Sequence, residues 1–317
     1  MNDQRSEERS FPLLQGPSMP VPGEPMPEYE GVIIRPPSEA DSLILQYTIG
    51  CSHNQCIFCP AYKQKRFRIR SLAEMEVDIN GCLPECAGTR RIFLADGDAL
   101  AAPFSDLLAL FSLLRTSFPK LQRIGMYANA KNILVRSMEE LKQLREAGLG
   151  ILYLGIESGD DELLQWMRKG VTAAEMAEAG RRVKDAGIKL SVTVLLGIGG
   201  VEASSRHARL TGKVLSTIDP DYVGALTTMV VNGTPLHELQ RRGRFMIPSA
   251  FAILSELAEM LEHTVMTRGL FFANHASNYL PVRVRMPSER DKTVAMIRTF
   301  AAEGDPALLK PEGMRRL

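Results

Sequence analysis

Residues 43–60 have the sequence LILQYTIGCSHNQCIFCP, and this stretch decides the fold. Its apolar first half has the character of a buried strand, and the strand leads straight into three cysteines, Cys51, Cys56 and Cys59. Three thiolates in one loop suit a soft metal or an iron–sulfur cluster. A closed zinc site takes four protein ligands. The stretch therefore indicates either a four-iron cluster with one iron left open, or a zinc site completed by His53 or by a distant ligand.

Further apolar, β-rich runs follow this strand at intervals too long for hairpins, at residues 91–95, 124–128, 151–156, 190–196 and 222–226. Helical patterns lie between them. One helix is expected to begin near Pro103, one opens with a capping box at Ser137 and stops at Gly148, and one runs from Thr172 to Gly187. Strands that alternate with helices predict a parallel α/β sheet. Both an incomplete TIM-type barrel and an open doubly wound sheet fit this pattern.

The composition is that of an ordinary globular protein, with 317 residues, 45% hydrophobic residues and a formal net charge of +1. Such a balanced charge disfavours a polyelectrolyte as the main partner. No apolar run is long enough to span a membrane, and no secretory signal is visible. Clustered cysteines are typical of a metal site in a reducing compartment. We therefore expect a cytoplasmic protein that does not associate with membranes.

The ends of the chain differ from its middle. Residues 1–38 are rich in proline, which predicts a tail that is disordered or draped over the body. The alternation of strands and helices ends near residue 236. Two helices are then expected, at residues 250–267 and at 288–302 with Ser288 as its cap, followed by a loose tail from Gly304. We accordingly divide the chain into a tail (1–38), a core (39–240) and a mainly helical C-terminal extension (241–317).

The active site of a parallel α/β fold lies at the carboxyl ends of its strands. The segments that follow the predicted strands are Ala95-Asp96-Gly97-Asp98, Asn129, Gly155-Ile156-Glu157-Ser158-Gly159 with Arg168 and Lys169 after it, and Gly197-Ile198-Gly199-Gly200. Glycine lets the backbone approach a ligand, a carboxylate accepts hydrogen bonds from ammonium or hydroxyl groups, and a cation pairs with a carboxylate. Each segment also has a purely structural interpretation, as a tight turn, a loop cap or a helix-end cation.

Taken together, these motifs resemble those of the radical S-adenosylmethionine (SAM) superfamily. The resemblance rests on the cysteine triplet, on Phe58 one place before its last member, and on the run at residues 155–159. This run is similar to that of the subgroup with Elongator-type, methylthiotransferase and coproporphyrinogen-oxidase-like members. The similarity covers roughly residues 43–240. The first gap between cysteines is one residue longer than the usual C-x3-C-x2-C, and Asp96 and Asp98 stand where a Gly-Gly-Glu segment has glycine and glutamate.

The resemblance implies a fold and two cofactors. It favours a partial (β/α)6 TIM-type barrel over the open sheet. It implies that Cys51, Cys56 and Cys59 hold a [4Fe–4S] cluster and that SAM chelates the remaining iron. The residues that it places around SAM are Phe58, Ala95, Asp96, Gly97, Asp98, Asn129, Glu157, Ser158, Arg168, Lys169, Gly197 and Ile198.

Within that set the resemblance assigns individual roles. Asp98 would hold the amino group of SAM, and Glu157 would hold its ribose. Arg168 and Lys169 compete for its carboxylate, while Gly197 and Ile198 would contact adenine. No catalytic residue is assigned.

Three features lie outside these motifs. The stretch from Lys63 to Arg70 is rich in cations, which suits either an anionic partner or a solvated surface. The segment 274–279 is dense in polar groups, and from it we predict a substrate pocket formed by Asn274, His275, Asn278 and Tyr279. Cys82 and Cys86 have no third cysteine nearby, so buried free thiols are expected there rather than a second cluster.

The sequence thus predicts an oxygen-sensitive radical SAM enzyme that abstracts a hydrogen atom from a substrate, with a flavodoxin- or ferredoxin-like protein as external electron donor. A small-molecule substrate is expected. The domains that methylthiotransferases, SPASM-type peptide modifiers and cobalamin-dependent members add to the core are not recognised in this sequence. One alternative is an RNA-modifying enzyme of the same superfamily, which depends on the cations at residues 63–70. Another is a non-catalytic iron–sulfur or zinc protein, which leaves the run at residues 155–159 unexplained.

Overall fold

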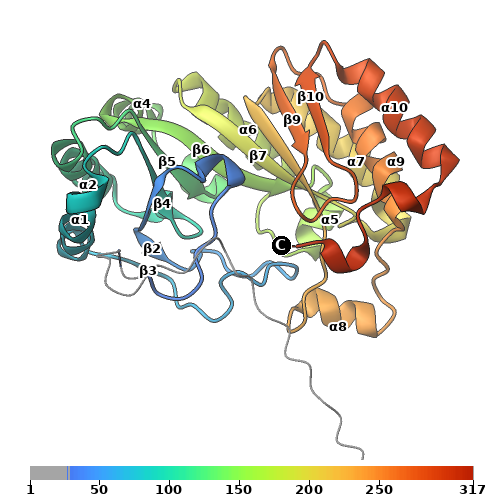
Figure 1. Cartoon of the computed structure of the whole chain (residues 1–317), viewed down its shortest axis with the longest axis horizontal. Coiled ribbons are helices and arrows are strands. Elements are labelled where there is room, and N and C mark those ends of the chain that lie inside the picture. Colours follow the sequence, from blue (N-terminus) through green and yellow to red (C-terminus); the bar gives the residue numbers. More distant parts are fainter. Residues whose placement is uncertain (1–26, 28, 317) are drawn as a thin grey trace, which may run out of the picture.

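One curved sheet with helices on its outer side forms the body of the protein (Figure 1). The structure is a computed structural model that describes residues 27 and 29–316. The eight strands lie in the order β1-β4-β5-β6-β7-β8-β9-β10. Their bounds are β1 (Leu43–Gln46), β4 (Arg91–Ala95), β5 (Arg123–Ala128), β6 (Leu149–Glu157), β7 (Lys189–Leu196), β8 (Tyr222–Thr227), β9 (Gly269–Ala273) and β10 (Val282–Met286).

The strands β1 to β9 of this sheet pair in parallel, and β10 pairs antiparallel with β9. Because β1 and β10 are the two edges and do not pair with each other, the barrel is incomplete. The predicted partial barrel is confirmed, and the open doubly wound alternative is not needed. The predicted strands at residues 91–95, 124–128, 151–156, 190–196 and 222–226 all fall inside observed strands. The run at residues 43–49 divides into β1 and β2 (Thr48–Ile49), which pairs with β3 (Arg68–Ile69) beyond the cysteine loop.

Helices connect the strands and cover the outer side of the sheet (Figure 1). They are α1 (Leu72–Cys86), α2 (Phe104–Ser117), α3 (Ala130–Leu134), α4 (Met138–Ala147), α5 (Asp161–Trp166), α6 (Ala173–Asp185), α7 (Gly200–Ile218), α8 (Pro235–Arg241), α9 (Ala250–Glu262) and α10 (Arg290–Glu303), with short 3-10 turns η1 (Pro37–Glu39), η2 (Ala99–Ala101), η3 (Pro306–Leu308) and η4 (Glu312–Met314). The predicted capping box forms at Ser137, and a second one forms at Thr172; each side chain accepts from the backbone three residues on.

Aromatic side chains fill the inside of the barrel. The ring centroid of Phe93 lies 5.0 Å from that of Tyr127 and 5.6 Å from that of Tyr153, both in edge-to-face contact. Below them the buried carboxylate of Glu39 accepts hydrogen bonds from Arg123 at 2.6 and 2.7 Å, and also from Tyr153. Glu39 and Arg123 therefore occupy the amino-terminal end of the barrel beneath the aromatic rings.

The C-terminal extension differs from the prediction in its strands, in the ends of its helices and in its tail. The extension contributes β9 and β10, which the sequence pattern did not reveal, beside the expected helices. The helix expected at residues 250–267 ends at Glu262, and the last long helix begins at Arg290 without the predicted Ser288 cap. The expected loose tail is wrong: the Arg315 side chain is buried and donates to the carbonyls of Ser277 and Thr228.

The N-terminal tail predicted for residues 1–38 lies largely outside the described residues. The part that is described rests on the barrel, since Tyr29 donates to the Ile44 carbonyl at 2.9 Å and the Glu30 amide donates to Gln46 at 2.8 Å. No helix within residues 27 and 29–316 is both long and apolar enough to cross a membrane.

Candidate active site

The three cysteines lie in the loop between β2 and β3, on the side of the sheet that the outer helices leave open (Figure 1). All three are half-buried free thiols. Two hydrogen bonds fasten the middle of the loop, because the Ile57 amide donates to the Met167 carbonyl and the Leu236 amide donates to the Ile57 carbonyl, each at 3.1 Å. The loop is thus held between the end of α5 and the start of α8.

The donor set fits a cluster better than a single ion. Among the described residues, no group of three or more His, Cys, Asp or Glu side chains is placed to hold one metal ion. The His53 ring is engaged elsewhere, since its Nε2 lies 2.7 Å from the Arg168 carbonyl and donates to it. Three thiols in one loop are the donor set that an iron–sulfur cluster takes. The structure therefore does not support the zinc site completed by His53.

Burial favours the protonated thiols of Cys56 and Cys59 when no metal is bound. It raises the pKa of Cys56 to about 11 and also raises the pKa of Cys59. Lys169 acts in the opposite direction on both thiols. Since a metal ligand has to be a thiolate, cluster assembly releases protons from this loop.

Gly97 allows the end of β4 to approach the cysteine loop. A Cβ atom at Gly97 would lie 2.7 Å from the Tyr62 ring and 2.9 Å from Cβ of Cys51, both too close for a real contact. The Gly97 amide also donates to the Gly50 carbonyl at 3.0 Å. The glycine in this segment is thus required by the close approach of two backbones.

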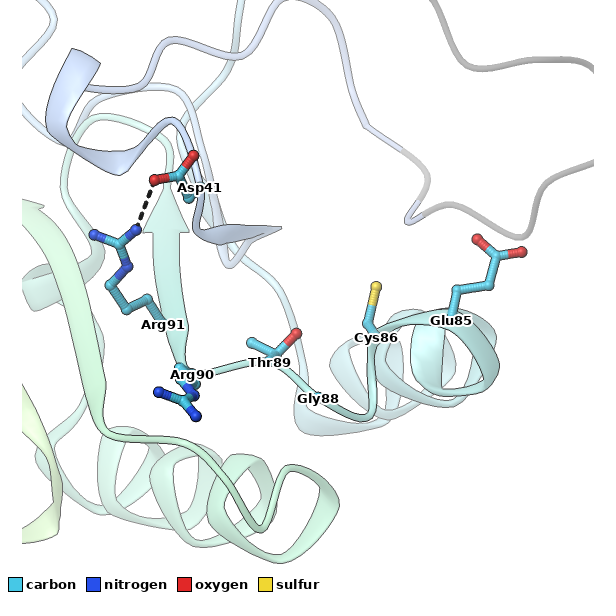
Figure 2. Close-up of a pocket in the computed structure, with 7 residues that line it drawn as sticks. All are labelled: Asp41, Glu85, Cys86, Gly88, Thr89, Arg90 and Arg91. Carbon is cyan, nitrogen blue, oxygen red and sulfur yellow. Dashed lines mark hydrogen bonds and ion pairs between the residues drawn. The ribbon is translucent and has the colours of Figure 1, made fainter.

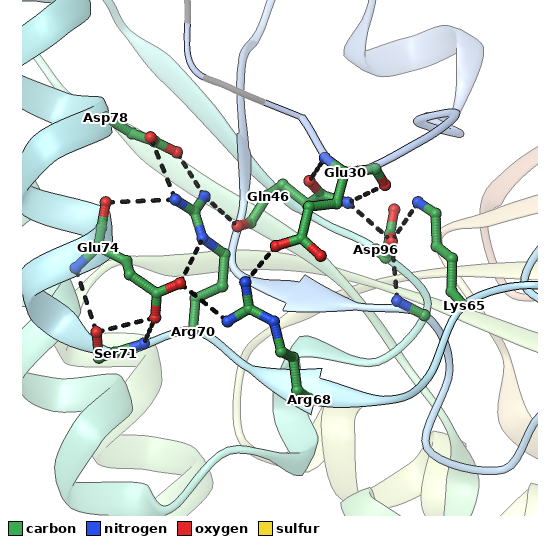
Figure 3. Close-up of polar contacts among 10 residues, drawn as sticks. Glu30, Gln46, Lys65, Arg68, Arg70, Ser71, Glu74, Asp78 and Asp96 are labelled. Atoms are coloured by element: carbon green, nitrogen blue, oxygen red, sulfur yellow. Dashed lines mark hydrogen bonds and ion pairs between the residues drawn. The ribbon is translucent and has the colours of Figure 1, made fainter.

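The two carboxylates beside Gly97 do different things. Asp96 points inward, and its Oδ2 accepts from the Gly50 amide at 2.9 Å, Gln46 at 3.0 Å and Lys65 at 2.7 Å (Figure 3). It therefore holds the end of β1 and the start of the cysteine loop together. The structure gives Oδ2 of Asp96 this role in the loop, while its buried Oδ1 has no hydrogen-bond partner among the described residues.

Asp98 lies at the centre of a polar cluster on the loop side. It accepts hydrogen bonds from Ser52 in the cysteine loop, from Asn129 at 2.6 Å and from Asn132. Burial raises the pKa of Asp98 to about 6, although these donors counteract the rise. The amide oxygen of Asn129 also caps α3 by accepting from the Asn132 backbone at 3.0 Å, which is its structural interpretation, while a contact with SAM stays a prediction. Sequence reasoning missed Asn132, although its position one turn after Asn129 at the start of α3 was the available signal.

Glu157 and Lys169 form an ion pair of 2.9 Å in which neither side chain is more than 14% exposed. Glu157 takes a left-handed backbone with φ of 63°, at a register shift between β6 and β7. Gly155 makes room for the carboxylate, because a Cβ there would lie 2.1 Å from Glu157 Oε1. Burial acts to lower the pKa of Lys169, but Glu157 and Cys56 outweigh it, so the pKa is raised and the ammonium group stays charged. Arg168 is exposed, so of the two competing cations Lys169 is the one that faces the cysteines.

Several of the residues predicted to bind the cofactor make contacts within the protein itself. The Ser158 hydroxyl contacts His207 on α7 at 2.8 Å. Ile198 is fully buried in an apolar cluster with Ile57 and Leu236, against which Phe58 also packs. Ala95 is fully buried inside the barrel. Gly197 has a φ of 79°, which fits a tight turn, and its amide donates to Glu256 at 2.7 Å.

The predicted substrate residues sit at the correct edge, after β9, but most of their polar groups are engaged within the protein. Asn278 is buried, accepts from Thr227 at 2.8 Å and donates to the Ala225 carbonyl at 2.9 Å. Tyr279 donates to Glu312 and lies under the Arg315 guanidinium, 4.2 Å from its ring centroid. His275 contacts Ser277 at 2.9 Å, whereas Asn274 is exposed. The segment braces β8 against the C-terminal turns.

Most cations of the stretch from Lys63 to Arg70 are engaged by the protein itself (Figure 3). Lys65 pairs with Asp96, Arg68 pairs with Glu30 and Glu74, and Arg70 pairs with Asp78. Lys63 donates to the Asn54 carbonyl at 2.8 Å but is exposed. The ion pairs of this stretch therefore connect the cysteine loop to α1 and to the N-terminal segment.

Cys82 and Cys86 lie on α1, away from the cysteine loop. Both are free thiols, and burial raises the pKa of Cys82 to about 11. Cys86 lines a shallow pocket at the start of β4, where Asp41 and Arg91 pair at 2.9 Å (Figure 2). This pocket is at the amino-terminal edge of the sheet, opposite the site.

Comparison with known proteins gives a family and several relatives. The model of the radical SAM superfamily matches residues 45–209. The chain is 27% identical to a tRNA uridine(34) acetyltransferase of Methanocaldococcus infernus over 34% of this chain and 21% of that protein. It is 25% identical to a tRNA-2-methylthio-N(6)-dimethylallyladenosine synthase of Dehalococcoides mccartyi over 68% of this chain and 52% of that protein.

Among solved structures, the radical SAM enzyme coproporphyrinogen III oxidase (HemN) from Escherichia coli superposes with a TM-score of 0.51. It is 16% identical and covers 68% of this chain and 51% of that one. This likeness shows the fold alone. The chain spans about half or less of the length of the two curated relatives named above.

Proposed function

The chain belongs to the radical SAM superfamily, and we propose that its cysteine loop, Asp98 and the Glu157–Lys169 pair together form the site that binds and cleaves SAM. The observation that carries the proposal is that the cysteine loop forms hydrogen bonds both to Asp98 and to the segment that holds the Glu157–Lys169 pair. Ser52 donates to Asp98 on one side, and His53 donates to the Arg168 carbonyl next to Lys169 on the other. These two hydrogen bonds connect the cysteine loop to the carboxylate on one side and to the segment of the ion pair on the other, which supports a common site.

The residues present fit both cofactors of the family. Cys51, Cys56 and Cys59 would hold a [4Fe–4S] cluster, whose role when bound is to deliver the electron that splits SAM into methionine and a 5′-deoxyadenosyl radical. Asp98 provides a carboxylate for the SAM ammonium group, and that charge would keep Asp98 ionised despite its burial. Lys169 provides the cation for the SAM carboxylate, and Glu157 can accept from the ribose hydroxyls. The apolar cluster around Ile57 and Ile198 excludes water from one wall of the site.

The substrate that we propose is a small molecule, from which the radical abstracts a hydrogen atom. The amino-terminal end of the barrel is closed by Glu39 and Arg123, and aromatic rings fill the space above them. Substrate would therefore be confined to the mouth of the barrel, between the cysteine loop and the residues that follow β8 and β9.

An external electron donor would meet the protein on its cysteine-loop side. Lys63, Lys131 and Arg168 are exposed there, and the first two lie close enough to His53 to lower its pKa, after the larger effect of burial. An acidic one-electron carrier of the flavodoxin or ferredoxin type suits such a surface.

RNA modification is the second candidate function, because the two curated relatives named above act on tRNA by their names. The engagement of Lys65, Arg68 and Arg70 in ion pairs weighs against it, since these cations are not available for phosphates. Replacing Lys63, Arg66 and Lys131 by glutamine tests it. A salt-dependent RNA affinity that falls in this variant would favour an RNA substrate, and no measurable RNA binding by the wild type would remove this candidate.

The test of the proposed function is product analysis. The protein is reconstituted with iron and sulfide under anaerobic conditions, reduced, and incubated with SAM, and the mixture is separated by chromatography. Formation of 5′-deoxyadenosine by the wild type but not by Cys56→Ala is expected. SAM that remains intact with a fully loaded cluster would contradict the proposal.

A further inference from the structure

A buried histidine on α7 joins two of the strand ends that carry the site. His207 has no exposed surface. Its Nε2 lies 2.9 Å from the Leu195 carbonyl and its Nδ1 lies 2.8 Å from the Ser158 hydroxyl. A carbonyl can only accept, so Nε2 carries the hydrogen and Nδ1 accepts from Ser158. Burial lowers the pKa of His207 to about 4, so the ring is neutral at neutral pH and this arrangement is fixed.

A buried glutamate on α9 completes the connection from the C-terminal extension. Glu256 is 2% exposed. Its Oε1 accepts from the Gly197 amide at 2.7 Å and lies 3.6 Å from His207 Nε2, while its Oε2 accepts from Ser204. Ile253 on the same helix packs against Gly197, where an added Cβ would lie 3.3 Å from its Cδ1.

The energetics indicate what this carboxyl group contributes. Burial raises the pKa of Glu256 to about 7, and among the described residues no Lys or Arg lies within ion-pair distance of it. A buried carboxyl group without a cation is costly, and an apolar side chain of similar size would pack there at lower cost. What an apolar side chain cannot do is accept from the Gly197 amide. The contribution of Glu256 therefore lies in the turn that it holds.

The turn in question is Gly197–Gly200, which follows β7 and reaches the same edge as the cysteine loop. Ile198 of this turn packs against Ile57 of that loop. His207 holds Leu195, two residues before the turn, and Ser158, directly after Glu157. One buried network thus sets the position of the turn relative to Glu157.

We propose that Glu256 and His207 are positioning residues for SAM, which fix the Gly197–Gly200 turn and the segment after Glu157 so that the two together receive the adenosine part of SAM. The inference rests on the proposed function. It makes the C-terminal extension a part of the cofactor site, because the carboxyl group that shapes the turn comes from α9.

The test compares two ligands in three variants. SAM and methionine, which lacks the adenosine, are titrated calorimetrically into the reconstituted, unreduced protein. Glu256→Leu removes the acceptor for the Gly197 amide, and Glu256→Gln keeps an oxygen in its place. Glu259→Gln is the matched control, because Glu259 lies on the same helix and its carboxylate pairs with Arg209 and Ser205 near the surface.

We expect Glu256→Leu to weaken SAM binding by about tenfold or more, which corresponds to about 1.4 kcal/mol, and to leave methionine binding and iron content unchanged. Glu256→Gln should retain most of the affinity, and Glu259→Gln should match the wild type. Ser158→Ala tests the other arm of the network, with the same selective loss, should Glu256→Leu not fold.

Two results would overturn the inference: SAM affinity that is unchanged in both Glu256→Leu and Ser158→Ala, or an equal loss for SAM and methionine. A wild type that does not bind SAM at all would instead overturn the proposed function.

Discussion

Lys169 Nζ lies 2.9 Å from Glu157 Oε1, at the point where the segment after β6 meets the cysteine loop. When SAM binds, Lys169 would leave Glu157 and pair with the carboxylate of SAM, and Glu157 would accept hydrogen bonds from the ribose hydroxyls of SAM instead. Their pairing keeps a nearly buried cation and a nearly buried carboxylate compensated until the ligand arrives.

Replacing Lys169 tests this arrangement. Lys169→Met leaves the Glu157 carboxylate without its cation and removes the partner of the SAM carboxylate. SAM affinity, measured by calorimetry on the reconstituted protein, should fall by about ten- to a hundredfold, equivalent to the loss of a charge-assisted hydrogen bond of about 1.5–3 kcal/mol. Arg168→Met is the matched control, because Arg168 is the adjacent cation and is exposed. A larger loss in Arg168→Met than in Lys169→Met would reverse the assignment.

The raised pKa of Asp98 predicts that the free energy of unfolding of the protein depends on pH. Its pKa is raised to about 6 by burial, so the ligand-free folded protein holds a proton on Asp98 that the unfolded chain releases at lower pH. Stability should therefore fall as pH rises from the ordinary range of an aspartate through about 6, by at most about 3 kcal/mol. Urea unfolding of the metal-free protein on both sides of this range measures it. The difference between wild type and Asp98→Asn isolates this residue, and parallel pH profiles would refute the prediction.

The ionisation of Asp98 should also affect SAM binding, but there the rise in pH should strengthen the interaction instead of weakening it. An ammonium group is held by the ionised form, so SAM affinity should rise with pH through about 6 in the wild type. Asp98→Asn should bind SAM more weakly and lose this part of the pH profile. A wild-type SAM affinity that does not change with pH in this range would show that Asp98 does not bind the amino group of SAM.

Asp96 is expected to control the retention of the cluster. Asp96→Ala leaves Lys65 and the Gly50 amide without their acceptor, in a place where Asp96 has no exposed surface. Removing one partner of a buried pair costs about 3–5 kcal/mol, and the freed loop should hold less iron per chain. Iron analysis and thermal unfolding measure both effects. Lys63→Met, which changes an exposed cation of the same stretch, should have neither.

A methyl group at Gly97 should disturb the cysteine loop directly. Gly97→Ala forces the Tyr62 ring and Cys51 apart, an overpacking that typically costs about 1–3 kcal/mol. Iron content should fall, and Gly88→Ala, where an added Cβ meets nothing within 4 Å, should keep it. A normal iron content in Gly97→Ala would contradict this prediction, because it would show that the cysteine loop accommodates the methyl group.

The sequence was sufficient for the strands and for several helix starts, because burial on both faces gives strands such as β6 a continuous apolar run, and because caps such as Ser137 leave a local pattern. It was not sufficient for β9. That strand has only five residues, and its sequence GLFFA lacks the regular alternation that would distinguish a strand from a short apolar loop.

The side chains of the site were harder to predict than its backbone segments. Asp96 and Asp98 stand two residues apart, and only the three-dimensional path of the loop shows that the first holds the chain and the second faces Ser52. Arg168 and Lys169 were not distinguishable by spacing, since the left-handed turn at Arg168 decides which cation faces inward. Glu256 had no signal at all, because its partner Gly197 lies on another strand end, far away in sequence.

The central claim is that the cysteine loop and the polar groups around it bind SAM at an open iron of a [4Fe–4S] cluster. The most direct measurement is electron paramagnetic resonance of the anaerobically reconstituted and reduced protein, recorded with and without SAM. We predict the signal of a four-iron cluster whose shape changes when SAM is added, in the wild type but not in Lys169→Met at the same SAM concentration. A cluster signal that SAM leaves unaltered in the wild type, or bound zinc in place of iron, would contradict the account.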